Sequence, residues 1–188
     1  MKADFENLGT IAGAYKLKFK LFSDERGSFS ELYRRSEGKK FDTNFSAEQI
    51  SISKNNRNVL RGLHYQVRYA QGQILSIISG SVFDVLVDLR PNSPTFKNVF
   101  HITISQGDEI SIYMPPGVAH GFYALEDSTH LLYINSKEYM PTAERGIIWN
   151  DPTLNIPWPV REPITSERDS AFPKLDDLPI NELPQRHQ

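Results

Sequence analysis

The sequence predicts an all-β protein of the sandwich or barrel type, and two observations support this fold class. Apolar and polar residues alternate along many short segments, which is the period-two pattern of half-buried strands. Turn residues separate these segments at near-regular spacing, and no ten-residue helical pattern stands between them. The chain of 188 residues contains no evident linker, so we expect one domain over residues 1–188.

The alternation begins at residues 15–21, where Tyr, Leu and Phe alternate with Lys, and it returns at residues 49–53. The other predicted strands are residues 58–65, 73–79, 81–89, 98–104, 109–114, 120–125 and 129–136. We expect a short helix within residues 36–48.

The pattern changes near residue 140, where tryptophans and prolines become frequent. This composition predicts an irregular C-terminal arm with short helical turns. From about residue 173, proline and acidic residues predict an extended tail.

Charge and composition exclude several classes of protein. Lys and Arg total 21 and Asp and Glu total 23, for a net charge of −2, which offers no basic surface for nucleic acid and no polybasic membrane anchor. Polar residues at the start and within residues 74–89 argue against a signal peptide or a membrane span. The chain has no cysteine, so it has no disulfide or thiolate chemistry, and we expect a cytoplasmic protein.

Several predicted strands carry a polar face, which a barrel could use to line a small-ligand cavity. Gln49, Ser51 and Ser53 alternate along one strand, and Tyr133 and Asn135 along another. The alternative is that these residues face solvent on one side of a sheet.

Arg61 and His64 favour the cavity, because they are unusual in an otherwise apolar strand. Strict alternation would put the two side chains on opposite faces of the sheet. A β-bulge at Gly62 would realign them, and glycine is common at bulges.

Residues 115–120 read P-P-G-V-A-H, which is similar to the second motif of the cupins. Metal-binding cupins also need H-x-H in the first motif, whereas residues 64–66 here read H-Y-Q. His101, His130 and His187 are expected to be exposed or structural. We therefore expect no bound metal, which would need about three convergent ligands.

A set of short motifs in a fixed order carries a more specific resemblance. The motifs are D-E-R-G-S-F (24–29), V-L-R-G-L-H-Y-Q (59–66), G-S-V-F-D-V (80–85), D-L-R (88–90), S-P-T-F (93–96), A-H-G-F (119–122), W-N-D-P (149–152) and S-E-R-D (166–169). Together they resemble the dTDP-4-dehydrorhamnose 3,5-epimerase family over about residues 15–173.

The resemblance implies a cupin-type double-stranded β-helix, or jelly roll, with a few short helices in the C-terminal arm. It implies a homodimer that needs no cofactor and acts on a nucleoside-diphosphate 4-keto-6-deoxyhexose in deoxysugar biosynthesis. The C4 ketone acidifies the protons on C3 and C5, so epimerisation at either carbon requires a base, a stabiliser of the enolate oxygen, and an acid on the opposite face of the ring. The alternative is a catalytically inactive sugar-nucleotide-binding module of the same fold.

The resemblance also implies roles for individual residues. His64 would be the base, Asp169 its partner, and Tyr133 the acid. Taken without the family, these residues are a structural histidine, a loop acid and a core tyrosine. The residues implied to bind substrate are Arg26, Glu31, Gln49, Ser51, Arg61, Gln73, His120, Tyr139, Glu144 and Arg168.

Two residues depart from the family pattern at the presumed sugar site. Gln73 stands where the family has Lys, and Ser51 stands where it has Asn. Gln73 can donate a hydrogen bond to the enolate oxygen but lacks the charge that strengthens such bonds. We infer a specialised relative that inverts one centre only, or that uses another nucleotide or sugar.

Overall fold

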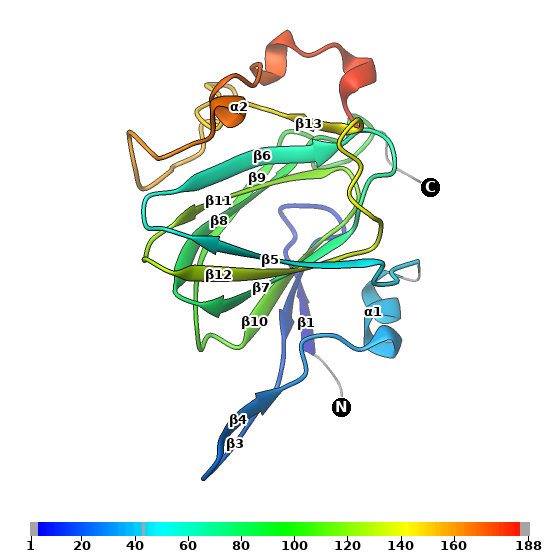
Figure 1. Cartoon of the computed structure of the whole chain (residues 1–188). Coiled ribbons are helices and arrows are strands. Elements are labelled where there is room, and N and C mark those ends of the chain that lie inside the picture. The colour runs from blue at the N-terminus through cyan, green and yellow to red at the C-terminus, as the bar shows by residue number, and fades with distance from the viewer. Residues whose placement is uncertain (1–3, 43, 185–188) are drawn as a thin grey trace.

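Two antiparallel sheets lie face to face in the computed structural model, which describes residues 4–42 and 44–184 (Figure 1). The six-stranded sheet has the order β1 (Asp4–Asn7), β2 (Tyr15–Lys18), β10 (Ile110–Met114), β7 (Gln73–Ser79), β12 (Thr129–Asn135) and β5 (Gln49–Asn55). The five-stranded sheet has the order β13 (Glu144–Gly146), β6 (Leu60–Gln66), β11 (Val118–Ala124), β8 (Ser81–Asp88) and β9 (Val99–Ser105). The predicted all-β fold is confirmed.

The strand predicted over residues 15–21 is divided in two, which corrects that prediction. β2 ends at Lys18, which pairs with Ile110 at the first residue of β10. Because the neighbouring strand begins there, the chain makes one more hydrogen bond of 3.0 Å, from the Phe19 N–H to the Glu109 carbonyl, and then no further strand pairing in this sheet among the described residues. It leaves the sheet and forms a separate ribbon of β3 (Leu21–Asp24) and β4 (Gly27–Ser30) that projects from the body of the molecule (Figure 1).

Helices are few and short. α1 (Arg35–Phe41) overlaps the region 36–48 where a helix was predicted and begins one residue before it. The C-terminal arm contains α2 (Glu167–Ser170) and two 3-10 turns, η1 (Leu175–Asp177) and η2 (Ile180–Glu182). With seven residues, α1 is much shorter than the roughly 20 that a bilayer span needs, and no helix in the described ranges could cross a membrane.

The C-terminal arm covers the outer face of the five-stranded sheet. Leu154, Leu175 and Leu183 are buried there against Leu63 and Ile147. Burying each of these side chains contributes about 1.5–3 kcal/mol, so the arm and the tail up to residue 184 are docked.

The space between the sheets is apolar over one part and polar over the other. Leu75, Leu86, Ile112, Phe122 and Leu131 form the apolar core there. Toward β5 and β6, the inward positions carry amide, hydroxyl, imidazole and guanidinium groups instead. A dry core does not explain these groups, and they mark the candidate site.

Candidate active site

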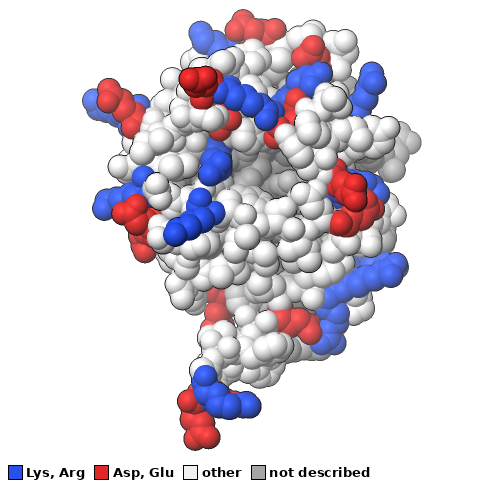
Figure 2. All heavy atoms as spheres, in the orientation of Figure 1, with Lys and Arg blue, Asp and Glu red and all other residues white. Residues whose placement is uncertain are grey.

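A cavity of about 290 Å³ opens between β5, β12 and β7 of one sheet and β6 and β11 of the other. Figure 2 shows the corresponding hollow in the face of the molecule between β6 and β5. The predicted site residues that line it are Gln49, Ser51, Arg61, His64, Gln73, His120, Tyr133, Tyr139 and Glu144.

A β-bulge in β6 brings Arg61 and His64 into this cavity, as the sequence predicted. His64 lies opposite His120 of β11, but Arg61 lies opposite Phe122, so β6 has one residue more than β11 between these pairs. Gly62 has φ +115°, and a Cβ there would lie 2.6 Å from the Cα of Gly121. The bulge therefore requires glycine at position 62.

His64 forms a pair with Asp169, 105 positions later in the chain. The His64 Nε2 lies 3.0 Å from Asp169 Oδ1, and Asp169 Oδ2 accepts a hydrogen bond of 3.2 Å from the backbone N–H of Gly62. The Asp169 side chain is only 6% exposed, whereas His64 is 32% exposed and borders the cavity. The imidazole is thus held by a buried carboxylate while it faces the space where a substrate would lie.

The local sequence of the arm places Asp169 within α2. Ser166 caps this helix by accepting a hydrogen bond of 3.0 Å from the Asp169 backbone N–H. Burial acts to raise the pKa of Asp169, but the hydrogen bonds from His64, Gly62 and Ser166 outweigh it, and the pKa lies below its ordinary value. Asp169 is therefore a carboxylate at neutral pH, as a partner for an imidazolium must be.

Tyr133 lines the same cavity from β12, in the opposite sheet. Its hydroxyl lies 3.4 Å from the Ser53 Oγ, and its ring meets that of His120 edge-on at 6.4 Å. Burial, with a smaller contribution from the charge of Asp84, raises the pKa of Tyr133 to about 12. The phenol therefore keeps its proton at neutral pH and can donate it.

A second His–Asp pair lies beside the first. The Nε2 of His120 is 2.7 Å from Oδ1 of Asp84, whose side chain is fully buried. The other oxygen, Asp84 Oδ2, has no hydrogen-bond partner among the described residues. The family resemblance implies a place beside the sugar for His120 but no role for Asp84, although Asp84 lies in the motif at residues 80–85.

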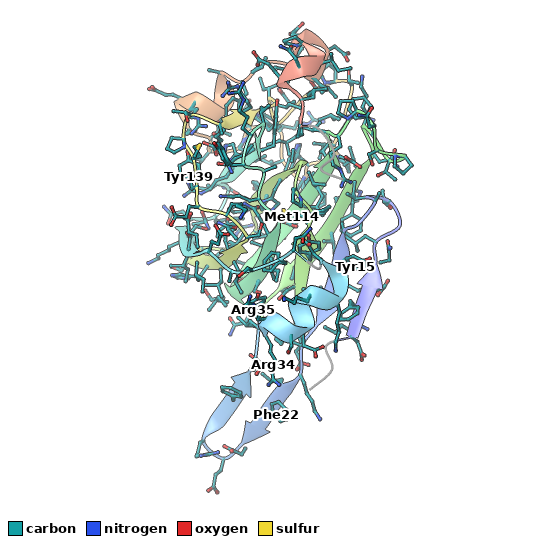
Figure 3. The ribbon with its side chains drawn as sticks, turned by 90° about the vertical axis from the view of Figure 1, so that its right-hand side faces the viewer. Tyr15, Phe22, Arg34, Arg35, Met114 and Tyr139 are labelled. Atoms are coloured by element: carbon teal, nitrogen blue, oxygen red, sulfur yellow. The ribbon has the colours of Figure 1, made fainter. Side chains whose placement is uncertain are left out.

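Arg168 stands at the rim and does not line the cavity itself. Its guanidinium contacts the Glu144 carboxylate, which also accepts a hydrogen bond of 2.6 Å from the Tyr139 hydroxyl. Hydrogen bonding to Glu144 raises the pKa of both Arg168 and Tyr139. Figure 3 shows Tyr139 at the edge of the molecule, and this residue lines the cavity.

Arg26 and Glu31 are not brought to the cavity of their own chain. Arg26 pairs with Asp24 in the projecting ribbon, and Glu31 pairs with Arg34 near the base of the ribbon. Figure 3 shows Phe22 of the same ribbon well away from the sheets. A role for Arg26 and Glu31 in substrate binding stays a prediction.

The two departures from the family pattern both lie in the cavity wall. Gln49 donates a hydrogen bond of 3.0 Å to Ser51, and Gln73 donates one of 3.1 Å to Gln71. Asn135 also lines the cavity, as its place on a polar strand face predicted, although it is not among the residues that the family resemblance implies to bind substrate. Its position at an inward-facing site of β12, two residues after Tyr133, was the signal available in the sequence.

The arrangement can support proton transfer at carbon. It combines an imidazole paired with a carboxylate, a protonated phenol on the facing sheet, and neutral hydrogen-bond donors. Arg61 is the only Lys or Arg among the described residues that line the cavity. No group of three His, Asp or Glu side chains in residues 4–42 and 44–184 is arranged to hold a metal ion, and His187 lies outside the described residues.

Comparisons with known proteins agree with this geometry. Residues 9–177 match the model of the dTDP-4-dehydrorhamnose 3,5-epimerase family. The curated enzyme of that name from Shigella flexneri is 40% identical over 164 residues, which cover 84% of this chain and 88% of that protein.

Two solved structures support the jelly-roll assignment. The epimerase from Legionella pneumophila in complex with dTDP-4-keto-L-rhamnose has a TM-score of 0.93 and 32% identity, with 99% of this chain and 100% of that chain covered. A 3'-monoepimerase from Streptomyces bikiniensis in complex with dTDP-quinovose has a TM-score of 0.86 and 29% identity, with 93% and 90% covered. The chain therefore belongs to the dTDP-4-dehydrorhamnose 3,5-epimerase family of nucleotide-sugar isomerases.

Proposed function

We propose that this protein epimerises a dTDP-4-keto-6-deoxyhexose at C3, C5 or both, with His64 as the base that removes the proton next to the C4 ketone. The observation that carries the proposal is the His64–Asp169 pair at 3.0 Å on the wall of a cavity that Tyr133 also lines. The nucleotide is inferred from the dTDP sugars bound by the two related structures. No feature of the cavity favours the alternative of an inactive binding module.

Each step of the reaction has a candidate group. A neutral imidazole nitrogen can accept a proton, so His64 has the chemistry of a base, and Asp169 would stabilise the resulting imidazolium. Tyr133 would return a proton to the opposite face of the ring, which inverts the centre. Gln73 would donate a hydrogen bond to the enolate oxygen, and Arg61 would contact an anionic oxygen of the substrate.

Isotope exchange tests this function directly. Incubation with a dTDP-4-keto-6-deoxyhexose in D2O should place deuterium at C3, C5 or both. The His64→Asn variant should lose exchange while it keeps its fold, because Asn cannot act as a base at neutral pH. His101→Asn is the matched control, since His101 is an exposed histidine on β9 outside the cavity. If His64→Asn exchanged at the wild-type rate, His64 would not be the base.

We further propose a homodimer in which the projecting ribbon reaches the second copy. Phe22 and Phe29 of the ribbon are 42% and 68% exposed, and Ile50 and Ile52 on the edge strand β5 are 65% and 61% exposed. Burial of such residues against another copy is favourable. This arrangement would allow Arg26 and Glu31 to serve the cavity of the partner copy, which their distance from their own cavity otherwise prevents.

Two measurements test the dimer. Sedimentation should give twice the chain mass for the wild type and a lower mass for Phe29→Asp. Mixing Arg26→Ala with His64→Asn under conditions that allow subunit exchange should restore part of the lost activity, because a mixed dimer would hold one site with both residues intact. A monomeric wild type would contradict the dimer. We also expect the enzyme to act in the cytoplasm, in deoxysugar biosynthesis for surface polysaccharides.

A further inference from the structure

Three carboxamide side chains stand in one row across the six-stranded sheet. Asn135 of β12 is in register with Gln49 of β5 on one side and with Gln73 of β7 on the other. Residues in register on adjacent strands have their Cβ atoms about 4.5–5.5 Å apart on the same face of the sheet. All three side chains line the cavity, so together they form an uncharged, hydrogen-bonding strip on its wall.

The outer members of this row are held by the protein. The Gln49 Nε2 donates to Ser51, and its Oε1 accepts a hydrogen bond of 2.6 Å from the backbone N–H of Tyr139. The Nε2 of Gln73 donates to Gln71. These bonds fix the orientation of both flanking amides.

Asn135 differs from its two neighbours. It is only 6% exposed, and its Oδ1 is buried without a hydrogen-bond partner among the described residues. A buried acceptor without a donor is destabilising, so an Asn whose Oδ1 is buried here implies a donor supplied by the ligand.

The chemistry of the ligand group follows from that of the amide. A carboxamide presents an acceptor oxygen and a donor nitrogen side by side. A 4-keto sugar with a hydroxyl at C3 presents the complementary pair, a donor O3–H beside an acceptor O4. A ketone oxygen alone could not satisfy Asn135 Oδ1, because it has no proton to donate.

We propose that Asn135 is a specificity-determining residue that binds the 3-hydroxy-4-keto edge of the sugar, with Oδ1 accepting from the C3 hydroxyl and Nδ2 donating to the C4 oxygen. This inference rests on the proposed epimerase function and adds the sugar substituent that the enzyme selects. Tyr133 lies two residues earlier on β12 and faces the same cavity, so the acid and the hydroxyl-binding residue share one strand. Gln73, in register with Asn135, is then the donor nearest to the same C4 oxygen.

The test compares two substrates, a dTDP-4-keto-6-deoxyhexose and its 3-deoxy analogue, by deuterium exchange at C3 and C5, the two carbons that flank the C4 ketone in both. We expect the wild type to favour the 3-hydroxy substrate by about 10- to 100-fold in kcat/KM, the effect of one buried hydrogen bond. Asn135→Leu, of similar size, should lose this preference by slowing the 3-hydroxy substrate and sparing the 3-deoxy one. Asn98→Leu is the control, because Asn98 is an exposed amide outside the cavity.

The outcomes are separable. Equal wild-type rates on the two substrates, or a preference that survives in Asn135→Leu, would overturn the role of Asn135 and leave the epimerase function intact. The wild-type comparison stands even if Asn135→Leu fails to fold. No exchange at C3 or at C5 of either substrate would overturn the epimerase function, and this inference with it.

Discussion

Replacing Asp169 with Asn tests the central pair of the site, because both oxygens of this carboxylate act as acceptors. Oδ1 faces the His64 Nε2 at 3.0 Å, and Oδ2 faces the Gly62 N–H at 3.2 Å. An amide offers one acceptor and one donor in the same space. One of the two contacts must therefore become a donor facing a donor, or His64 must change its tautomer.

Either orientation of the amide harms catalysis. With its NH2 toward His64, the ring must present a lone pair at Nε2 and carry its proton on Nδ1, which blocks the nitrogen that faces the cavity. With its NH2 toward Gly62, the imidazolium loses its counter-charge. Hydrogen bonds to charged groups are worth about 1.5–3 kcal/mol, so we expect exchange to slow by about 10- to 150-fold.

The assay is deuterium incorporation at C3 and C5, followed by NMR under saturating substrate. Asp151→Asn is the matched control, because Asp151 is 2% exposed and accepts backbone hydrogen bonds from Thr153, Leu154 and Leu175 outside the cavity. The control should lose stability but keep its rate per folded molecule. A folded Asp169→Asn variant that exchanges at the wild-type rate would refute the reasoning.

Three further predictions concern the bulge, the acid and the pH dependence. In urea unfolding, Gly62→Ala should lower the free energy of unfolding by more than the ~1–3 kcal/mol that backbone strain costs, because the new Cβ would also clash with Gly121. Gly27 has φ +125° with open space around it, so Gly27→Ala should lose only the strain energy. Equal losses would contradict a tight bulge. Tyr133→Phe should slow inversion by about 10²-fold or more while deuterium still enters with retention from the His64 side; unchanged inversion by NMR would exclude Tyr133 as the acid. Folding lowers the pKa of Asp169. The free energy of unfolding of the wild type should therefore exceed that of Asp169→Asn by its full amount at pH values above the unfolded pKa of about 3.9. This excess should vanish as pH falls through the lower pKa of the folded state. Urea unfolding at several pH values measures this difference, which should not grow toward acid.

Alternation in the sequence predicted the strands of the two sheets other than β1 and β13. It was wrong at residues 15–21, because the alternation continues past Lys18 although the neighbouring strand begins at Ile110. Periodicity reports which face of a strand is buried, but it does not report where the partner strand begins. The short β13 gave no signal, because three residues are too few for a pattern.

The site was predictable only in part from local sequence. The Gly62 bulge could be anticipated, because Arg61 and His64 are polar residues at incompatible positions of one apolar strand. The contact between His64 and Asp169 spans 105 positions, so only the family resemblance pointed to it. The Asp84–His120 pair was missed because its two residues are 36 positions apart and come together only when strands β8 and β11 pair.

Because Asp169 lies on the docked C-terminal arm, the sheets and the His64–Asp169 pair would be completed at different times during synthesis. Both sheets are complete by Gly146, the last residue of β13. A nascent chain could therefore assemble its sandwich while the arm is still inside the ribosome, with His64 in position but without its carboxylate. The His64–Asp169 pair would be completed late in translation, when α2 emerges and docks, so an unfinished chain would bear a cavity whose histidine lacks its carboxylate partner.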